Sequence, residues 1–247
     1  MKNTYKFATA AIAVMLSFGA NAESWSYDDP SVWGDIHGYE TCGTGTEQSP
    51  IDLDLSSSVE DDDLEKLKHK FNSVPLNVIN NGHTVQINTD ARSYTKTELG
   101  KQRLLQFHFH SPSENTLNGE HFPLEAHFVH INDDGALSVV GIFFEEGDSN
   151  STLQEILEAS PHTVGTNESG HSIDPNDVLG GKKTSEYFRF SGSLTTPPCT
   201  EGVNWYVSQD TQSVSSFQVE EFVELFHGGN SRPVQPLNAR TLRTTED

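Results

Sequence analysis

The chain has 247 residues, of which 36 are acidic and 15 are lysine or arginine, and its formal net charge is −21 at pH 7. A surface this negative argues against DNA, RNA or an anionic membrane as a partner, because each of these needs clustered lysine and arginine. The length fits one large domain or two small ones.

Residues 1–22 have the pattern of a secretory signal peptide. Two lysines precede an apolar run, no acid occurs, and the small residues Ala20-Asn21-Ala22 stand before Glu23. The apolar run is too short and too rich in small residues for a spanning helix, so we expect no membrane insertion. The predicted mature domain, residues 23–247, loses two lysines and carries a formal charge of −23. We expect it to be exported through the inner membrane to the periplasm.

Two cysteines in an exported chain predict one disulfide, and Cys42 with Cys199 is the only intramolecular pairing available. This bond would close a loop of more than 150 residues. On the chain-entropy model such a closure stabilises the fold by roughly 5 kcal/mol.

The elements that follow are mostly short strands, after an acidic run over 59–63 that we expect to be a solvated loop. Alternating residues flank an Asn-Gly turn signal in 75–88, and β-branched and aromatic residues are enriched at 104–110, 124–132, 136–146 and 202–208. The best helix pattern covers 216–226, with Ser215 and Gln218 as a capping pair and Gly228 as a stop. No repeat or composition break marks a second domain. These elements predict one mostly β (α+β) domain with a large sheet and short peripheral helices.

The stretch "QFHFHSPSENTLNGEHFPLEAHFVH", residues 106–130, contains five histidines. Side chains on a strand alternate between faces, so His108 and His110 share one face with Gln106. The segment between the two predicted strands is rich in Pro, Gly and Asn and permits a hairpin-like return, which would bring His127 beside the pair. Three neutral imidazoles with an open fourth position suit zinc.

Metal-bound histidines also need an acceptor at the other ring nitrogen. Gln106 can accept from His108, Glu125 can accept from His127, and a backbone carbonyl would serve His110. His121 lies in the connecting loop and His130 has the opposite strand parity, so we do not expect either to be a ligand.

A rival interpretation is the cupin pattern, in which His108, His110 and Glu114 would bind iron or manganese. That pattern expects glycine at the positions of Gln102 and His121, and its second motif is not found. We therefore favour His127 as the third ligand.

The chain resembles the α-class carbonic anhydrases, in particular the exported bacterial kind. Besides the histidine stretch it carries, in the order of that family, "SWSY" (24–27), "WGDI" (33–36), "QSPIDL" (48–53), "NNGH" (80–83), "GSLTTPPCTEGVNW" (192–205) and "RPVQPLNAR" (232–240). The resemblance spans nearly the whole mature chain. It implies a single catalytic domain around a twisted, mainly antiparallel sheet of about ten strands.

The resemblance also implies the cofactor and the reaction. One Zn2+ per chain would be held by His108, His110 and His127, with the carbonyl of Asn230 behind His110 and the side chains of Gln106 and Glu125 behind the other two. A zinc-bound hydroxide would attack CO2, and the reversible products would be bicarbonate and a proton. By similarity, Glu114 accepts from the hydroxyl of Thr195, which orients the hydroxide.

For the substrate and the proton, the resemblance implies two further groups of residues. The CO2 site would be the apolar wall formed by Val129, Val139, Leu194, Val203 and Trp205, with Thr196 contacting bicarbonate. His83 would be the proton shuttle, because histidine titrates near pH 7, and Tyr27, Asn81 and Gln86 would order the relaying water.

Several positions depart from the animal members of the family. Ser111, Asn115, Phe190 and Gln86 stand where Trp, His, Tyr and Asn are usual, which puts the water network in doubt and leaves the zinc site intact. An alternative hypothesis is that the chain is a non-catalytic binding module with the same fold. The residues expected for zinc binding are all present, so the sequence does not support this alternative. A homodimer is a family expectation only.

Overall fold

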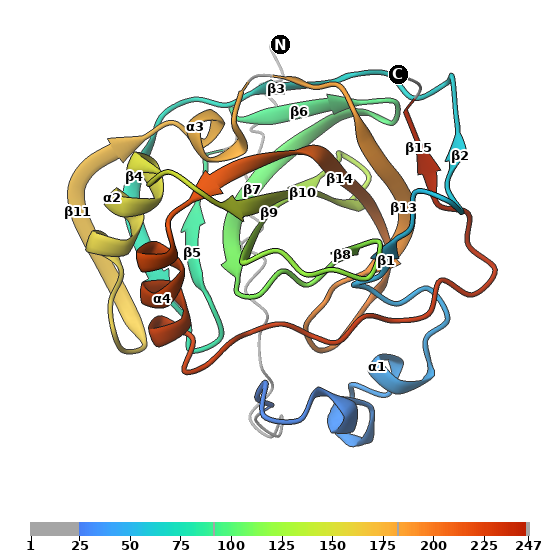
Figure 1. Ribbon diagram of the computed structural model, residues 1–247, viewed down its shortest axis with the longest axis horizontal. Coiled ribbons are helices and arrows are strands. Elements are labelled where there is room, and N and C mark those ends of the chain that lie inside the picture. The colour runs from blue at the N-terminus through green and yellow to red at the C-terminus, as the bar shows by residue number, and fades with distance from the viewer. Residues whose placement is uncertain (1–24, 91, 182, 246–247) are drawn as a thin grey trace, which may run out of the picture.

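A 13-stranded mixed sheet forms the centre of the computed structural model, which describes residues 25–245 apart from 91 and 182 (Figure 1). The predicted signal peptide lies outside the described residues. No helix in the described part of the chain is long and apolar enough to cross a membrane.

The main path of the sheet follows an order that brings distant parts of the sequence together. It runs through β11 (Gly165–Ile173), β4 (Val74–Asn80), β5 (Val85–Asn88), β7 (Gly100–His110), β9 (Leu124–Ile131), β10 (Leu137–Glu146), β14 (Glu201–Val214), β13 (Tyr187–Ser193), β15 (Arg243–Thr244) and β2 (Val59–Glu60). Off this path, β6 (Tyr94–Thr97) pairs with β7 and with β3 (Leu67–Lys70), which pairs with β12 (Lys183–Thr184). A separate parallel pair joins β1 (Asp52–Leu53) to β8 (Thr116–Leu117).

Within the large sheet, β10–β14 and β15–β2 are parallel and the remaining neighbours are antiparallel. The prediction of a mostly β fold around a large, mainly antiparallel sheet is therefore confirmed. The predicted strands over 75–88, 104–110, 124–132, 136–146 and 202–208 are present, and β14 extends further than its pattern indicated.

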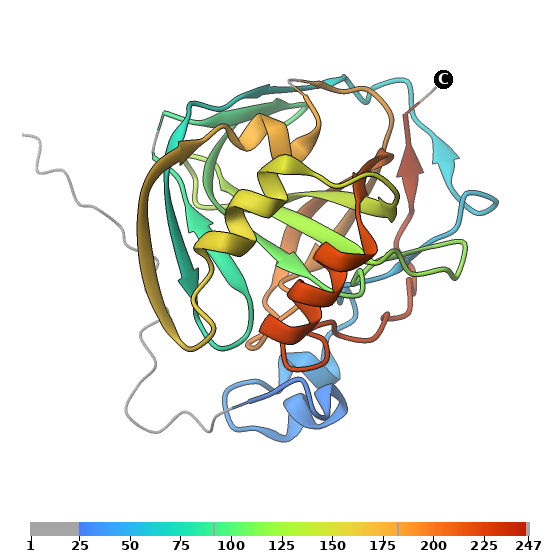
Figure 2. The ribbon, with the colours of Figure 1, turned by 60° about the vertical axis from the view of Figure 1, so that its left-hand side comes forward.

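The helices are short and peripheral, as expected. They are η1 (Pro30–Asp35), α1 (Thr41–Thr44), α2 (Ser151–Ala159), α3 (Pro175–Leu179) and α4 (Ser216–Leu225). The helix α4 has the predicted capping box between Ser215 and Gln218. It packs beside α2, which covers β4 and β11 (Figure 2). The sequence pattern did not predict α2, although Asn150 caps it by accepting from the backbone N–H of Thr152 and Leu153.

One face of the sheet carries apolar side chains that pack in the larger core, and the other face carries the histidines of β7. Phe107, Phe109 and Phe128 are fully buried in the larger apolar core, where the rings of Phe107 and Phe128 stack with centroids 5.2 Å apart. Burying each of these side chains stabilises the fold by roughly 1.5–3 kcal/mol. The histidines of β7 alternate with these phenylalanines, so strand parity directs them to the other face.

The prediction of a solvated loop over 59–63 is wrong at its start. Val59 and Glu60 form the edge strand β2, which pairs in parallel with β15, and Asp61 pairs with Arg243 at 2.6 Å. The backbone N–H of Val59 donates to the carbonyl of Leu242. This strand exists because the C-terminal segment lies beside it, and a local pattern cannot report such a partner.

Candidate metal centre

Three histidines meet where β7 and β9 pair. His108 stands directly opposite His127 in this antiparallel pair, and His110 stands opposite Glu125. The three ring centroids lie 4.6–5.4 Å from one another. One nitrogen from each ring lies within 4.8 Å of the others, which is a spacing that a single metal ion can bridge. His121 and His130 are not part of this cluster.

Each of the three rings has one nitrogen next to an acceptor. Nδ1 of His108 lies 2.9 Å from Oε1 of Gln106, and Nδ1 of His110 lies 2.8 Å from the carbonyl oxygen of Asn230. Nε2 of His127 lies 3.0 Å from Oε1 of Glu125. These contacts favour N–H at the held nitrogens and leave a lone pair on Nε2 of His108, Nε2 of His110 and Nδ1 of His127.

There is a second reason why the ring nitrogens that keep a lone pair are suited to a metal ion. Nε2 of His110 is buried and has no hydrogen-bond partner within the described structure. A buried polar atom left unsatisfied costs about 1–3 kcal/mol. A ligated metal would remove that cost, and the all-nitrogen donor set suits zinc.

Burial sets the protonation of the cluster. Burial lowers the pKa of His108 and of His110, and the neighbouring His127 lowers both further. Burial also lowers the pKa of His127, but the facing Glu125 carboxylate outweighs it and the net pKa is raised. For Glu125, burial raises the pKa, and the charge of His127 together with hydrogen bonds lowers it on balance. Two of the rings are thus held in the neutral form that ligates metals, and the third is paired with a carboxylate.

Asn115 holds Glu125 in place, which the sequence reasoning did not foresee. Oε2 of Glu125 accepts from the backbone N–H groups of Glu114 and Asn115 at 2.8 and 2.9 Å, and Oε1 accepts from the Asn115 side chain at 2.8 Å. The only signal for this role was that Asn115 departs from the residue usual in animal relatives. The side chain also accepts from the backbone N–H of Ile51.

Glu114 lies next to the cluster but outside it. Its Oε1 accepts from the backbone N–H of Arg232 at 3.0 Å, and its Oε2 lies 3.4 Å from Nε2 of His110. The hydrogen bond that we predicted from Thr195 to Glu114 is not present. Thr195 is buried, and Oε2 of Glu114 has no hydrogen-bond partner in the described structure. The expected acceptor therefore faces the metal ligands and receives no hydrogen bond from the expected donor.

The predicted apolar wall gathers in one place. Val139, Val203 and Trp205 are buried in a single cluster, and Val129 and Leu194 pack against it. The ring of Trp205 meets His127 edge to face at a centroid distance of 4.9 Å. An apolar surface therefore adjoins the third histidine. Thr196 is half-buried in the neighbouring "LTTPPC" turn, where its carbonyl accepts from the backbone N–H of Cys199.

His83 is placed in the turn between β4 and β5. Its ring stacks on Trp25 with centroids 3.8 Å apart and an angle of 10°, and the ring of Tyr27 lies at 6.4 Å. Partial burial lowers the pKa of His83. Asn81 shapes the turn by accepting from the backbone of His83, whereas Gln86 donates to Asn88 and stands opposite His108 in the sheet. Sequence reasoning did not single out Trp25.

A sequence model of eukaryotic-type carbonic anhydrases matches residues 28–246. The chain belongs to this α-carbonic anhydrase family. A carbonic anhydrase of Pectobacterium atrosepticum is 40% identical over 242 residues, covering 94% of this chain and 97% of the relative. The α-carbonic anhydrase of Thermovibrio ammonificans, solved with the inhibitor sulfanilamide, superposes with a TM-score of 0.85 at 39% identity and covers 90% of this chain and 99% of its own. A hyperthermostable carbonic anhydrase from a hydrothermal vent chimney gives a TM-score of 0.84 at 42% identity, over 90% and 100% of the two chains.

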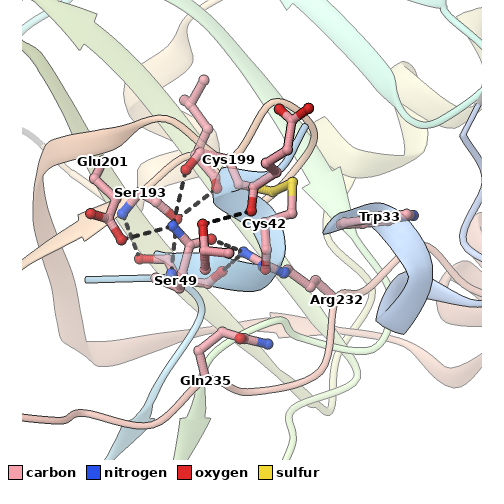
Figure 3. Close-up of a disulfide and its surroundings, with 12 residues drawn as sticks. Trp33, Cys42, Ser49, Ser193, Cys199, Glu201, Arg232 and Gln235 are labelled. Carbon is pink, nitrogen blue, oxygen red and sulfur yellow. Dashed lines mark hydrogen bonds between the residues drawn. A yellow bond between two sulfur atoms is a disulfide. The ribbon is translucent and has the colours of Figure 1, made fainter. Parts of the chain in front are cut away.

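In this α-carbonic anhydrase family member, the predicted disulfide between Cys42 and Cys199 is confirmed, with the two Cα atoms 5.0 Å apart. Arg232 is buried beside it (Figure 3). Its guanidinium donates to the carbonyls of Cys42 and Ser49 and to the side chain of Gln48, at 2.7–2.9 Å.

The backbone of Arg232 donates to Glu114, so one residue connects the disulfide region with the metal centre. Arg232 lies within a family motif of the sequence, which indicates no role for it. A buried guanidinium needs acceptors for its donors, but nothing in the sequence indicates which loops supply them.

Proposed function

We propose that this chain is a zinc enzyme that reversibly hydrates CO2 to bicarbonate and a proton, and that it acts in the periplasm. The observation that carries the proposal is the cluster of His108, His110 and His127, each with its second ring nitrogen beside an acceptor. Family membership supports the reaction. The disulfide and the signal-peptide pattern support export.

Different residues of the site would carry out different parts of the reaction. Zinc, when bound by the three histidines, would make a water molecule acidic enough to supply hydroxide near neutral pH. The apolar surface of Val139, Val203 and Trp205 would receive CO2, because a neutral molecule with weak acceptors gains little from charged neighbours. Glu114, whose Oε2 lies 3.4 Å from Nε2 of His110, would act as an acceptor beside the metal, since a carboxylate can only accept.

The proton would leave by way of His83. This half-buried ring stacks on Trp25, and histidine titrates near neutral pH. Tyr27 would help to order the water on the way. Burial, and then the nearby charge of Glu114, raise the pKa of Tyr27 well above its ordinary value, so its hydroxyl stays protonated and able to donate.

The cupin alternative finds less support. Glu114 would have to join His108 and His110 as a ligand, but the mutually close donor atoms belong to the three histidines. A non-catalytic module would not need the three orienting acceptors.

Zinc analysis together with a stopped-flow CO2 hydration assay tests the proposal. We expect about one zinc per chain, with activity abolished by a chelator or an aryl sulfonamide. The His127→Ala variant should lose zinc affinity by on the order of 100-fold or more, since even supporting residues cost 10- to 100-fold. His121→Ala, in the same connecting segment, is the matched control and should keep both zinc and activity. A wild-type protein without zinc or without hydration activity would contradict the proposal.

A further inference from the structure

The turn that carries His83 is rigid within itself. Oδ1 of Asn80 accepts from the backbone N–H of Gly82, and Oδ1 of Asn81 accepts from those of His83 and Thr84, all at 2.9 Å. Gly82 takes a φ of 88°, which glycine adopts without the cost of a side chain. These bonds shape the turn, but they do not attach it to the strand that holds the metal ligands.

Thr84 makes the first attachment of the His83 turn to the strand β7. The β5–β7 ladder ends where Gln86 stands opposite His108. Beyond that point, the buried hydroxyl of Thr84 donates to the carbonyl of Phe109 at 2.6 Å and accepts from its backbone N–H at 3.3 Å. A side chain therefore continues the pairing after the backbone ladder has ended.

The second attachment comes from Asn230. Its Nδ2 donates to the carbonyl of His83 at 3.0 Å and to the carbonyl of Phe109 at 2.9 Å. Its Oδ1 accepts from the backbone N–H of Ser111 at 2.8 Å. The residue is 1% exposed, so water does not compete for these bonds. Its side chain thus joins the turn to β7, while its carbonyl faces His110.

Both attachments converge on Phe109, the residue between the ligands His108 and His110. We propose that Thr84 and the Asn230 side chain are positioning residues that set the distance of His83 from the three-histidine centre. This inference rests on the proposed role of His83 as the proton shuttle. The distance matters because a displacement of about 1 Å can slow a positioned transfer by on the order of 100-fold.

The substitution Thr84→Val tests the inference, because valine keeps the shape and removes the hydroxyl. We expect kcat in weak buffer to fall by about tenfold, toward the value of His83→Ala, while kcat/KM for CO2 stays within about twofold. Imidazole should restore kcat. Thr84→Ser keeps the hydroxyl and should behave as the wild type. A kcat that does not change, or an equal fall in kcat and kcat/KM, would overturn the inference.

Amide hydrogen exchange gives a readout that does not depend on activity. In Thr84→Val the amide of Ser111, which donates to Asn230, should exchange at least about tenfold faster than in the wild type, and in Asn230→Ala the amide of Phe109, which donates to Thr84, should do the same, because losing one attachment loosens the other. Asn230→Ala keeps the backbone carbonyl that faces His110. Unchanged exchange in both variants would overturn the attachment. If His83→Ala shows no loss in weak buffer, the shuttle proposal fails, and the exchange rates still decide whether the turn is anchored as described.

Discussion

The carbonyl oxygen of Asn230 lies 2.8 Å from Nδ1 of His110, although 120 residues separate them in the sequence. The strand β7 supplies the histidine, and the segment that follows α4 supplies the acceptor. This contact orients the ring so that its free Nε2 points toward the other two histidines. The metal centre is therefore built by the β7–β9 pair together with a segment near the C-terminal end of the chain.

Replacing Glu114 by glutamine separates the two roles considered for this residue. We expect Glu114→Gln to keep about one zinc per chain and to slow CO2 hydration by on the order of 100-fold, because the amide is neutral and can donate where the carboxylate only accepts. Zinc analysis and stopped-flow kinetics measure the two effects. Glu120→Gln, the same change at an exposed site, is the control. Loss of zinc from Glu114→Gln alone would favour Glu114 as a ligand.

His83→Ala should slow turnover in weak buffer by on the order of tenfold to a hundredfold, because the variant has no group that titrates near neutral pH to relay the proton. Added imidazole should restore the rate, and strong buffer should hide the defect. His171→Ala, on the exposed strand β11, serves as the control. If imidazole does not rescue His83→Ala, the residue is not the relay.

Reducing and alkylating Cys42 and Cys199 should lower the free energy of unfolding by about 2–5 kcal/mol, because the bond constrains a long loop in the unfolded chain. Activity should fall as well, since Cys199 ends the turn that carries Thr195. Urea unfolding and the hydration assay, with and without reductant, measure these effects. A reduced protein that matches the oxidised one in both respects would show that the disulfide does not clamp the turn.

Two buried histidines outside the metal centre predict acid sensitivity. Burial lowers the pKa of His69 to about 3 and that of His130 to about 4, and the hydroxyl of Thr95 contacts both rings at 2.9 Å. In the unfolded chain both should titrate near their ordinary pKa of about 6.5. The unfolded state therefore binds more protons between about pH 6.5 and pH 4, and the folded state loses up to about 1.4 kcal/mol per pH unit for each histidine as the pH falls.

Urea unfolding at pH 7, 6 and 5 tests this expectation. In His69→Gln the pH slope should be shallower by about one proton, while His171→Gln should leave it unchanged. The metal ligands are the same in all three proteins, so their own titration cancels in the comparison. Equal slopes in the wild type and His69→Gln would mean that folding does not lower the pKa of His69.

The sequence by itself was sufficient to predict the elements that depend on residues close to one another along the chain. Alternating residues predicted β4 and β5, and enrichment in β-branched and aromatic residues predicted β7, β9 and β10. The pair Ser215 and Gln218 predicted the start of α4. Strand parity placed His108, His110 and His127 on one face, because side chains alternate wherever a strand forms. These features depend on neighbours along the chain, and the sequence contains those neighbours.

Only the tertiary structure decided the features that depend on distant partners. The edge strand β2 exists because β15 lies beside it, and Arg232 finds its acceptors in loops that the disulfide holds nearby. Thr84 attaches the His83 turn to Phe109, which is 25 residues away in the sequence. The predicted bond between Thr195 and Glu114 is missing although both residues are buried. Hydrogen bonds require partners within about 3 Å, and the order of residues along a chain does not specify which distant groups come that close.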